Sequence, residues 1–135
     1  MSVISARAGT PTAPGVGMTT ETKRHGDRKQ FVALEVALEI IVGLRGLVAG
    51  IRRQDSKLAE QVVASASSVA ANLAEGNRRS GRDRGHLFRI AAGSADETRT
   101  HLRVAVAWGY LEASEIDSVL ALIDRELGII WGLTH

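Results

Sequence analysis

The segment that decides the fold runs from Ser68 to Leu111 and reads SVAANLAEGNRRSGRDRGHLFRIAAGSADETRTHLRVAVAWGYL. It joins two stretches of helical periodicity through one short basic turn, and it places small and polar residues where a bundle helix ordinarily carries leucine. Polar groups on an apolar stripe cost stability unless they are hydrogen-bonded, so they specify a packing arrangement or mark a site. We favour a polar network that fixes the register of the two helices over a catalytic role. The residues expected in this network are Ser68, Asn72, Glu75, Ser94 and Glu97.

Helical periodicity continues on both sides of this segment. Apolar residues recur with a period of 3.6 in four stretches, at about 30–53, 56–76, 80–108 and from 114 onward, and no strand pattern competes with it. Because the connections after the second and the third of these stretches are short, consecutive helices are expected to be antiparallel neighbours. The sequence therefore predicts an all-α protein, an antiparallel up-down four-helix bundle over residues 30–135.

The expected helix ends carry residues that suit them. Ser and Asp side chains accept hydrogen bonds from the free N–H groups at a helix start. The residues predicted to begin helices in this way are Asp55 or Ser56, Ser80 and Ser114. Gly76 or Asn77 suits the left-handed conformation that commonly ends a helix.

Residues 1–29 differ from the rest of the chain. They are rich in Ala, Gly, Thr and charged residues, contain both prolines and show no apolar periodicity. Such a composition predicts a disordered tail. Met18, within this segment, is an alternative start of translation.

The first helical stretch, 30–53, carries more apolar surface than one bundle core requires. Its two apolar stripes together cover roughly 200° of the helix, about twice the usual core-facing arc. We expect the excess to form an oligomer interface. The residues assigned to this interface are Val36, Ile40, Leu44, Leu47 and Ile51.

Length and composition restrict the class of protein. A chain of 135 residues with 44% apolar and 24% charged residues fits one globular domain with its own core. Without cysteine, the chain has no disulfide, no thiolate nucleophile and no cysteine-based zinc site. No apolar run approaches the ~20 residues of a membrane span, and no secretory signal is evident. We therefore expect a cytoplasmic protein.

Positive charge is concentrated in one turn of the bundle. The net charge is only +2, but residues 76–103 hold seven arginines against three acidic residues. The arginines around the turn are Arg78, Arg79, Arg82, Arg84 and Arg89. Arginine forks and a helix N-terminus both favour phosphate, which points to nucleic acid or an acidic partner. A solvated turn, or ion pairs with acids across subunits, explains the same pattern equally well.

No catalytic arrangement stands out. Glu97 and His101 lie four residues apart on one helix face and could be a metal-ligand pair, although an ordinary hydrogen bond or ion pair is the simpler interpretation. The chain has no Glu-x-x-His or His-Glu-x-x-His motif, and no serine stands in a Gly-x-Ser-x-Gly elbow. We therefore predict no enzymatic activity and no cofactor; a metal-dependent enzyme centred on these two residues is a distant alternative.

Four groups of residues form a recognisable pattern: Ser68-x-x-x-Asn72-x-x-Glu75-Gly76, Arg79-Ser80, Phe88-x-Ile90-Ala91-x-Gly93-Ser94-x-x-Glu97 and Gly109-Tyr110-Leu111. Over about residues 30–132 the chain resembles the four-helix-bundle family once called S23 ribosomal proteins. Members of this family include proteins encoded in intervening sequences of bacterial 23S rRNA genes. The accessory variability protein of diversity-generating retroelements is a relative.

The resemblance implies a homopentameric, barrel-like ring of four-helix bundles with a basic surface. In the retroelement branch it also implies binding to a reverse transcriptase and RNA, but residues 30–135 are near neutral, which favours the generic branch. The leading hypothesis is a binding or scaffold protein that holds RNA, DNA or a nucleic-acid enzyme on its basic turn. The alternative is a structural or protein-interaction module that binds no nucleic acid.

Overall fold

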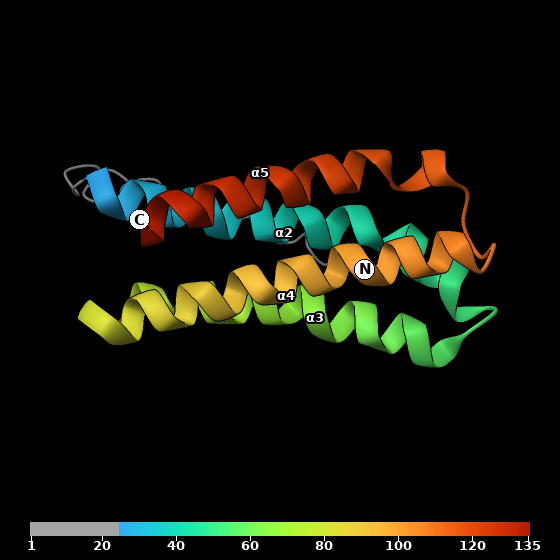
Figure 1. Cartoon of the computed structure of the whole chain (residues 1–135), viewed down its shortest axis with the longest axis horizontal. Coiled ribbons are helices and arrows are strands. Elements are labelled where there is room, and N and C mark those ends of the chain that lie inside the picture. Colours follow the sequence, from blue (N-terminus) through green and yellow to red (C-terminus); the bar gives the residue numbers. More distant parts are fainter. Residues whose placement is uncertain (1–24) are drawn as a thin grey trace, which may run out of the picture.

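The computed structural model describes residues 25–135, with side chains from Val32 onward. This range holds the α-helices α2 (His25–Arg52), α3 (Ser56–Asn77), α4 (Gly81–Ala107) and α5 (Asp117–Thr134), with a 3-10 helix, η2 (Ala113–Ile116), before α5. Consecutive helices run in opposite directions, and the α2–α5 pair lies above the α3–α4 pair in Figure 1. The most extensive packing joins α2 to α3, α3 to α4, α4 to α5 and α5 to α2, so the predicted antiparallel four-helix bundle is confirmed.

The start of the bundle differs from the prediction. α2 begins at His25, so the last five residues of the predicted 1–29 tail are helical. The remaining part of that predicted tail, residues 1–24, lies outside the described residues. Among the helices of residues 25–135, none is long and apolar enough to cross a membrane.

Asp55 connects two turns at one end of the bundle. Its Oδ1 accepts a hydrogen bond from the backbone N–H of Leu58 at 3.0 Å, which is the helix cap expected for α3. Its Oδ2 accepts a hydrogen bond from the Tyr110 hydroxyl at 3.2 Å. Tyr110 follows Gly109, whose φ of +83° forms the turn after α4. Partial burial, and then the bond to Asp55, raise the pKa of the Tyr110 phenol.

At two other helix starts the observed capping differs from the predicted capping. Ser80 precedes α4 as predicted, but its hydroxyl makes no capping hydrogen bond. The cap predicted at Ser114 is wrong, because the N-cap residue is Glu112, two residues earlier, which forms a reciprocal capping box with Glu115. In that box, the backbone N–H of Glu112 donates to the Glu115 carboxylate at 2.8 Å.

Gly76 does not end α3 in the left-handed conformation that the sequence suggested. The helix continues to Asn77, and the positive φ of this turn, +60°, belongs to Gly81. The role of Gly76 is close packing, because a Cβ at this position would lie 2.7 Å from the ring of Phe88. Phe88 is among the largest fully buried side chains, and its ring occupies the space that a side chain at position 76 of α3 would need.

The oligomer interface predicted on α2 requires correction. Val36, Ile40, Leu44 and Ile51 are at most 3% exposed in a single chain, and Leu47 is half-buried. These residues belong to the bundle's own core, because α2 packs on both α3 and α5 and therefore turns a wide arc inward. The apolar excess of α2 lies instead on its outer face, where Leu38 and Val42 are 45% and 59% exposed.

Candidate functional site

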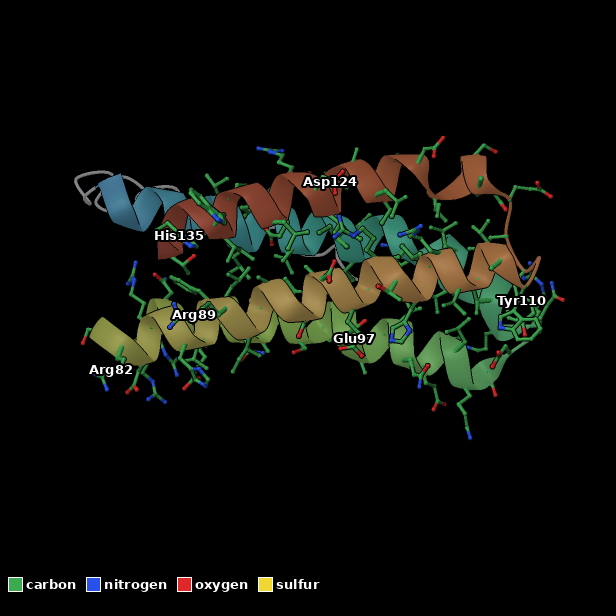
Figure 2. The ribbon with its side chains drawn as sticks, viewed as in Figure 1. Arg82, Arg89, Glu97, Tyr110, Asp124 and His135 are labelled. Carbon is green, nitrogen blue, oxygen red and sulfur yellow. The ribbon has the colours of Figure 1, made fainter. Side chains whose placement is uncertain are left out.

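Five arginines surround the connection between α3 and α4, and we call this surface the basic pole. Arg78 and Arg79 follow α3, and Arg82, Arg84 and Arg89 lie on the first three turns of α4. All except the half-buried Arg84 are exposed. Figure 2 shows Arg82 and Arg89 along the first part of α4, near the end of the bundle where α5 finishes. The structure therefore brings together the five arginines singled out in the sequence.

Two arginines and a histidine form a track along one face of α4. Arg82, His86 and Arg89 are spaced i, i+4 and i+7, a spacing that places them on the same side of a helix, and all three are exposed. With a rise of 1.5 Å per residue, the first and last of them start about 10 Å apart along the helix axis. The track therefore presents donors over a length that several consecutive phosphates of a strand would occupy.

Few of these arginines have acidic partners in the described part of the chain. Arg79 forms an exposed ion pair with Glu75, one helical turn earlier. Arg84 lies over the ring of Phe88, with its guanidinium carbon 5.2 Å from the ring centroid. No ion pair joins Arg78, Arg82 or Arg89 to a carboxylate within residues 25–135. Neutralisation by a neighbouring acid therefore does not account for Arg78, Arg82 and Arg89 within the part of the chain whose side chains are described.

A polar seam runs along the α3–α4 contact. The hydroxyl oxygens of Ser65 and Thr98 are 2.7 Å apart, and those of Ser68 and Ser94 are 2.8 Å apart. The Asn72 side-chain amide donates to the carbonyl and hydroxyl oxygens of Ser68 at 2.9 and 3.0 Å. Because each of the two hydroxyl pairs links α3 to α4 at a defined position along the bundle, the seam fixes the register of the two helices.

The predicted network is therefore partly correct. Ser68, Asn72 and Ser94 belong to the seam, but Glu75 pairs with Arg79 and Glu97 points to solvent, with a side chain that is 58% exposed. The remaining members of the seam are Ser65 and Thr98, which are 4% and 1% exposed. Both lie on the same sequence stripes as the predicted members, so the pattern contained the signal for them.

Glu97 and His101 form a simple surface pair. Glu97 Oε2 lies 3.2 Å from His101 Nε2, one turn apart on α4. Within the described range of the chain, no three His, Cys, Asp or Glu side chains are grouped so that they could hold a metal ion. The pair therefore lacks the further protein ligands that a catalytic metal would need from this part of the chain.

Glu126 is a buried acid that the sequence analysis did not identify. Its side chain is 0% exposed, and neither carboxyl oxygen has a hydrogen-bond partner. Burial raises its pKa to about 8, and the nearby charge of Arg125 opposes this only partly. The signal was its spacing: Glu126 follows Ile123 by three residues and precedes Ile130 by four, both on the core stripe of α5.

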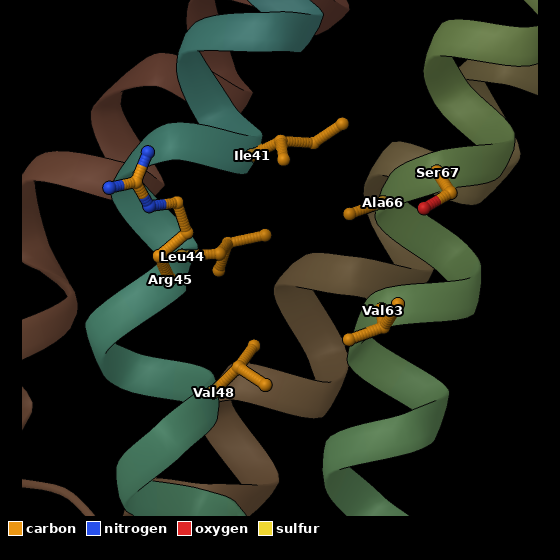
Figure 3. Close-up of a pocket in the computed structure, with 7 residues that line it drawn as sticks. All are labelled: Ile41, Leu44, Arg45, Val48, Val63, Ala66 and Ser67. Carbon is orange, nitrogen blue, oxygen red and sulfur yellow. The ribbon is translucent and has the colours of Figure 1, made fainter. Parts of the chain in front are cut away.

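An apolar groove separates α2 from α3 on the outer surface. Figure 3 shows Ile41, Leu44 and Val48 of α2 facing Val63 and Ala66 of α3 across it. The groove has a volume of about 200 Å³ and is mostly apolar. Val63 is 43% exposed, and the exposed residues Leu38 and Val42 of α2 continue the apolar surface beside it. This surface, which we call the α2–α3 face, is larger than scattered exposed side chains would make it.

Together these features define an all-helical bundle with a hydroxyl-lined seam, a basic pole and an apolar outer face. The family model described as 23S rRNA-intervening sequence protein matches residues 32–132, so the chain belongs to this family. The match also confirms the family resemblance found from the sequence motifs.

A solved structure has the same fold. It is the crystal structure of a protein with unknown function from the S23 ribosomal protein family of Bacteroides thetaiotaomicron, with a TM-score of 0.69 and 19% sequence identity. The similarity covers 76% of this chain and 97% of that one. At this identity the likeness concerns the fold. No curated protein matches the chain.

Proposed function

We propose that the protein is a non-enzymatic, oligomeric binding protein of the cytoplasm that holds nucleic acid on its basic pole. The observation that supports this most directly is the set of exposed arginines at the α3–α4 connection, of which Arg78, Arg82 and Arg89 have no acidic partner in the described residues. Arginine offers several donors in a fixed plane and binds phosphate oxygens in pairs. A phosphate backbone would occupy these donors without any requirement for base sequence.

Assembly into a ring is the second part of the proposal. The α2–α3 face exposes Leu38, Val42 and Val63, and a second copy seated there would remove this apolar surface from water. The family resemblance supplies the number of five. In a cyclic pentamer, the basic pole would occur once per subunit, and the separate charges would become one ring of positive potential.

The oligomer is tested by light scattering. We expect a mass five times that of the 14.4 kDa chain for the wild type. Because Val42 is 59% exposed, Val42→Glu should place a charge in the interface and release smaller species that keep the helical circular dichroism of the wild type. A wild type that stays monomeric at micromolar concentration would disprove assembly.

Nucleic-acid binding is tested by titrating labelled single- and double-stranded RNA and DNA at two salt concentrations. The affinity should decrease steeply with salt and depend little on base sequence, because binding to phosphate releases counterions. The triple variant Arg78→Ala, Arg79→Ala, Arg82→Ala should abolish binding and keep the oligomer intact, since these side chains are exposed.

A control variant that also loses three positive charges distinguishes an effect of the basic pole from an effect of net charge. Arg52→Ala, Arg53→Ala, Lys57→Ala removes three exposed cations near the α2–α3 connection, at the opposite end of the bundle. This variant should bind almost as well as the wild type. If both variants lose affinity equally, the basic pole is not the site. If the wild type binds none of the nucleic acids at low salt, the interaction-module alternative replaces the proposal.

A further inference from the structure

A second groove lies next to the basic pole, between the first half of α4 and the last turns of α5. It is lined by Arg89 and Ala92 of α4 and by Leu127, Ile130, Trp131 and His135 of α5, among others. Its volume is about 240 Å³, roughly the space of eight water molecules. Such a space suits one planar ring system and is too small for a folded peptide segment. Figure 2 shows Arg89 and His135 at the same end of the bundle, on α4 and α5 respectively.

Trp131 gives this groove a large exposed aromatic surface. Its side chain is 63% exposed although it is among the most apolar residue types. Its ring is stacked on that of His135, with centroids 4.1 Å apart and an angle of 9° between the planes. The His135 ring is held in place because its Nδ1 lies 3.0 Å from the backbone carbonyl oxygen of Trp131. The two rings form one stack at the edge of the groove, with the imidazole on one face of the indole, and we call this stack the Trp131–His135 platform.

Arg89 joins this platform to the basic pole. It is the last member of the Arg82, His86, Arg89 track, and it also lines the groove. Its guanidinium lies along α4 next to Gly85, where a Cβ would be 3.4 Å from Nη1. Arg89 and the exposed indole of Trp131 line the same groove, and an arginine near an aromatic ring is a combination suited to a base and its own phosphate.

We infer that the Trp131–His135 platform, with Arg89 beside it, is a base-stacking site that selects single-stranded over double-stranded nucleic acid. This inference rests on the proposed function, since the basic pole supplies the phosphate contacts. In a duplex both faces of every base are stacked inside the helix, so only an unpaired base can lie on an external ring. The arginines of the basic pole attract either form, and the platform adds affinity only for the single strand.

The affinity test compares two exposed tryptophans of the same helix bundle. Trp131→Leu should weaken binding of a short single-stranded oligouridylate about 5- to 100-fold, the range for loss of one stacked base. Its affinity for a double-stranded RNA of equal length should stay within about twofold of the wild-type value. The matched control is Trp108→Leu, because Trp108 is 70% exposed but lies at the other end of α4. This control should bind both nucleic acids like the wild type.

Fluorescence provides a direct readout of stacking. The chain contains two tryptophans, so Trp108→Phe leaves Trp131 as the sole indole. Its emission should be quenched when the single strand binds and remain nearly constant with the duplex. Emission of Trp108 in the Trp131→Phe variant should not respond to either.

The outcomes distinguish this inference from the proposed function. Failure of the wild type to bind any nucleic acid at low salt overturns both. Normal binding of the single strand by Trp131→Leu, with loss of binding in the basic-pole triple variant, overturns the stacking site alone. A change in oligomer mass in Trp131→Leu would place Trp131 in a subunit contact and would also overturn it.

Discussion

Replacing Glu126 should stabilise the protein, and the gain should depend on pH. Its carboxyl group is fully buried, and both oxygens lack hydrogen-bond partners. Removing this polar group from water therefore destabilises the folded state, because no protein hydrogen bond replaces those to water. Glu126→Leu replaces it with an apolar side chain that can pack between Ile123 and Ile130 on the same stripe. Substituting unpartnered buried polar groups by apolar ones of similar size commonly stabilises.

The direction of the pH effect follows from the raised pKa. Below about pH 4.5 the carboxyl is protonated in both states; between 4.5 and about 8 the folded state keeps its proton and the unfolded chain releases it. The free energy of unfolding of the wild type therefore falls with rising pH by at most about 1.4 kcal/mol per unit in this window. The advantage of the leucine variant should grow by about 2 kcal/mol from pH 5 to pH 7 and level off above pH 8.

Urea unfolding at pH 5, 7 and 9, at one protein concentration, measures this difference. Only the gap between variant and wild type is informative, because the other titratable groups of the protein are the same in both chains. Glu60→Gln is the control, since it removes a glutamate carboxyl from an exposed position of α3 instead of a buried one. A constant gap for Glu126→Leu, or a loss of stability at pH 7, would show that the carboxyl has a partner and refute the reasoning.

Two further substitutions test the packing of α3 on α4. Gly76→Ala should lower the free energy of unfolding by about 1–3 kcal/mol, because its Cβ would lie 2.7 Å from Phe88; Gly46→Ala, with open space around it, should not destabilise. Thr98→Val should cost about 0.5–1.5 kcal/mol in urea unfolding, because the 2.7 Å hydrogen bond between the Ser65 and Thr98 hydroxyls is lost while Ser65 keeps its bond to the Val62 carbonyl oxygen. Unchanged stability in Thr98→Val would mean that the polar seam does not fix the helix contact.

The fold was accessible from the sequence because two independent signals agree on it. The 3.6-residue period places the four helices, and the capping carboxyl of Asp55 marks the start of α3 within one residue. The small and hydroxyl residues of Ser68–Leu111 mark the contact between α3 and α4, where the Phe88 ring packs on Gly76. A glycine at a close contact, a carboxyl at a helix start and a hydroxyl on an apolar stripe each indicate from their side-chain chemistry what must lie next to them.

Which face of each helix is buried was harder to predict from the sequence. Periodicity locates an apolar stripe but does not show which neighbouring helix covers it. Two adjacent stripes on α2 are both apolar, and only the position of α5 on its second side decides that Ile40 is internal and Leu38 external. Glu126 was not predicted to be buried for the same reason. Periodicity alone does not show whether an acidic side chain on the core stripe can reach solvent. Whether it can do so depends on the packing of α5 between α2 and α4.

The two proposed surfaces can act at the same time because of the order of the helices around the bundle. Packing contacts join α2 to α3, α3 to α4, α4 to α5 and α5 to α2, so the α2–α3 face and the α4–α5 groove lie on opposite sides. A copy seated beside Val42 therefore does not cover Trp131. In a ring each subunit also has a second neighbour, and the proposal requires that this neighbour contacts a surface other than the α4–α5 groove. Cyclic symmetry also keeps every basic pole on the same side of the ring, whereas antiparallel pairing would separate them. A long single strand could then contact several poles at once, so avidity would compensate for the modest charge of each subunit.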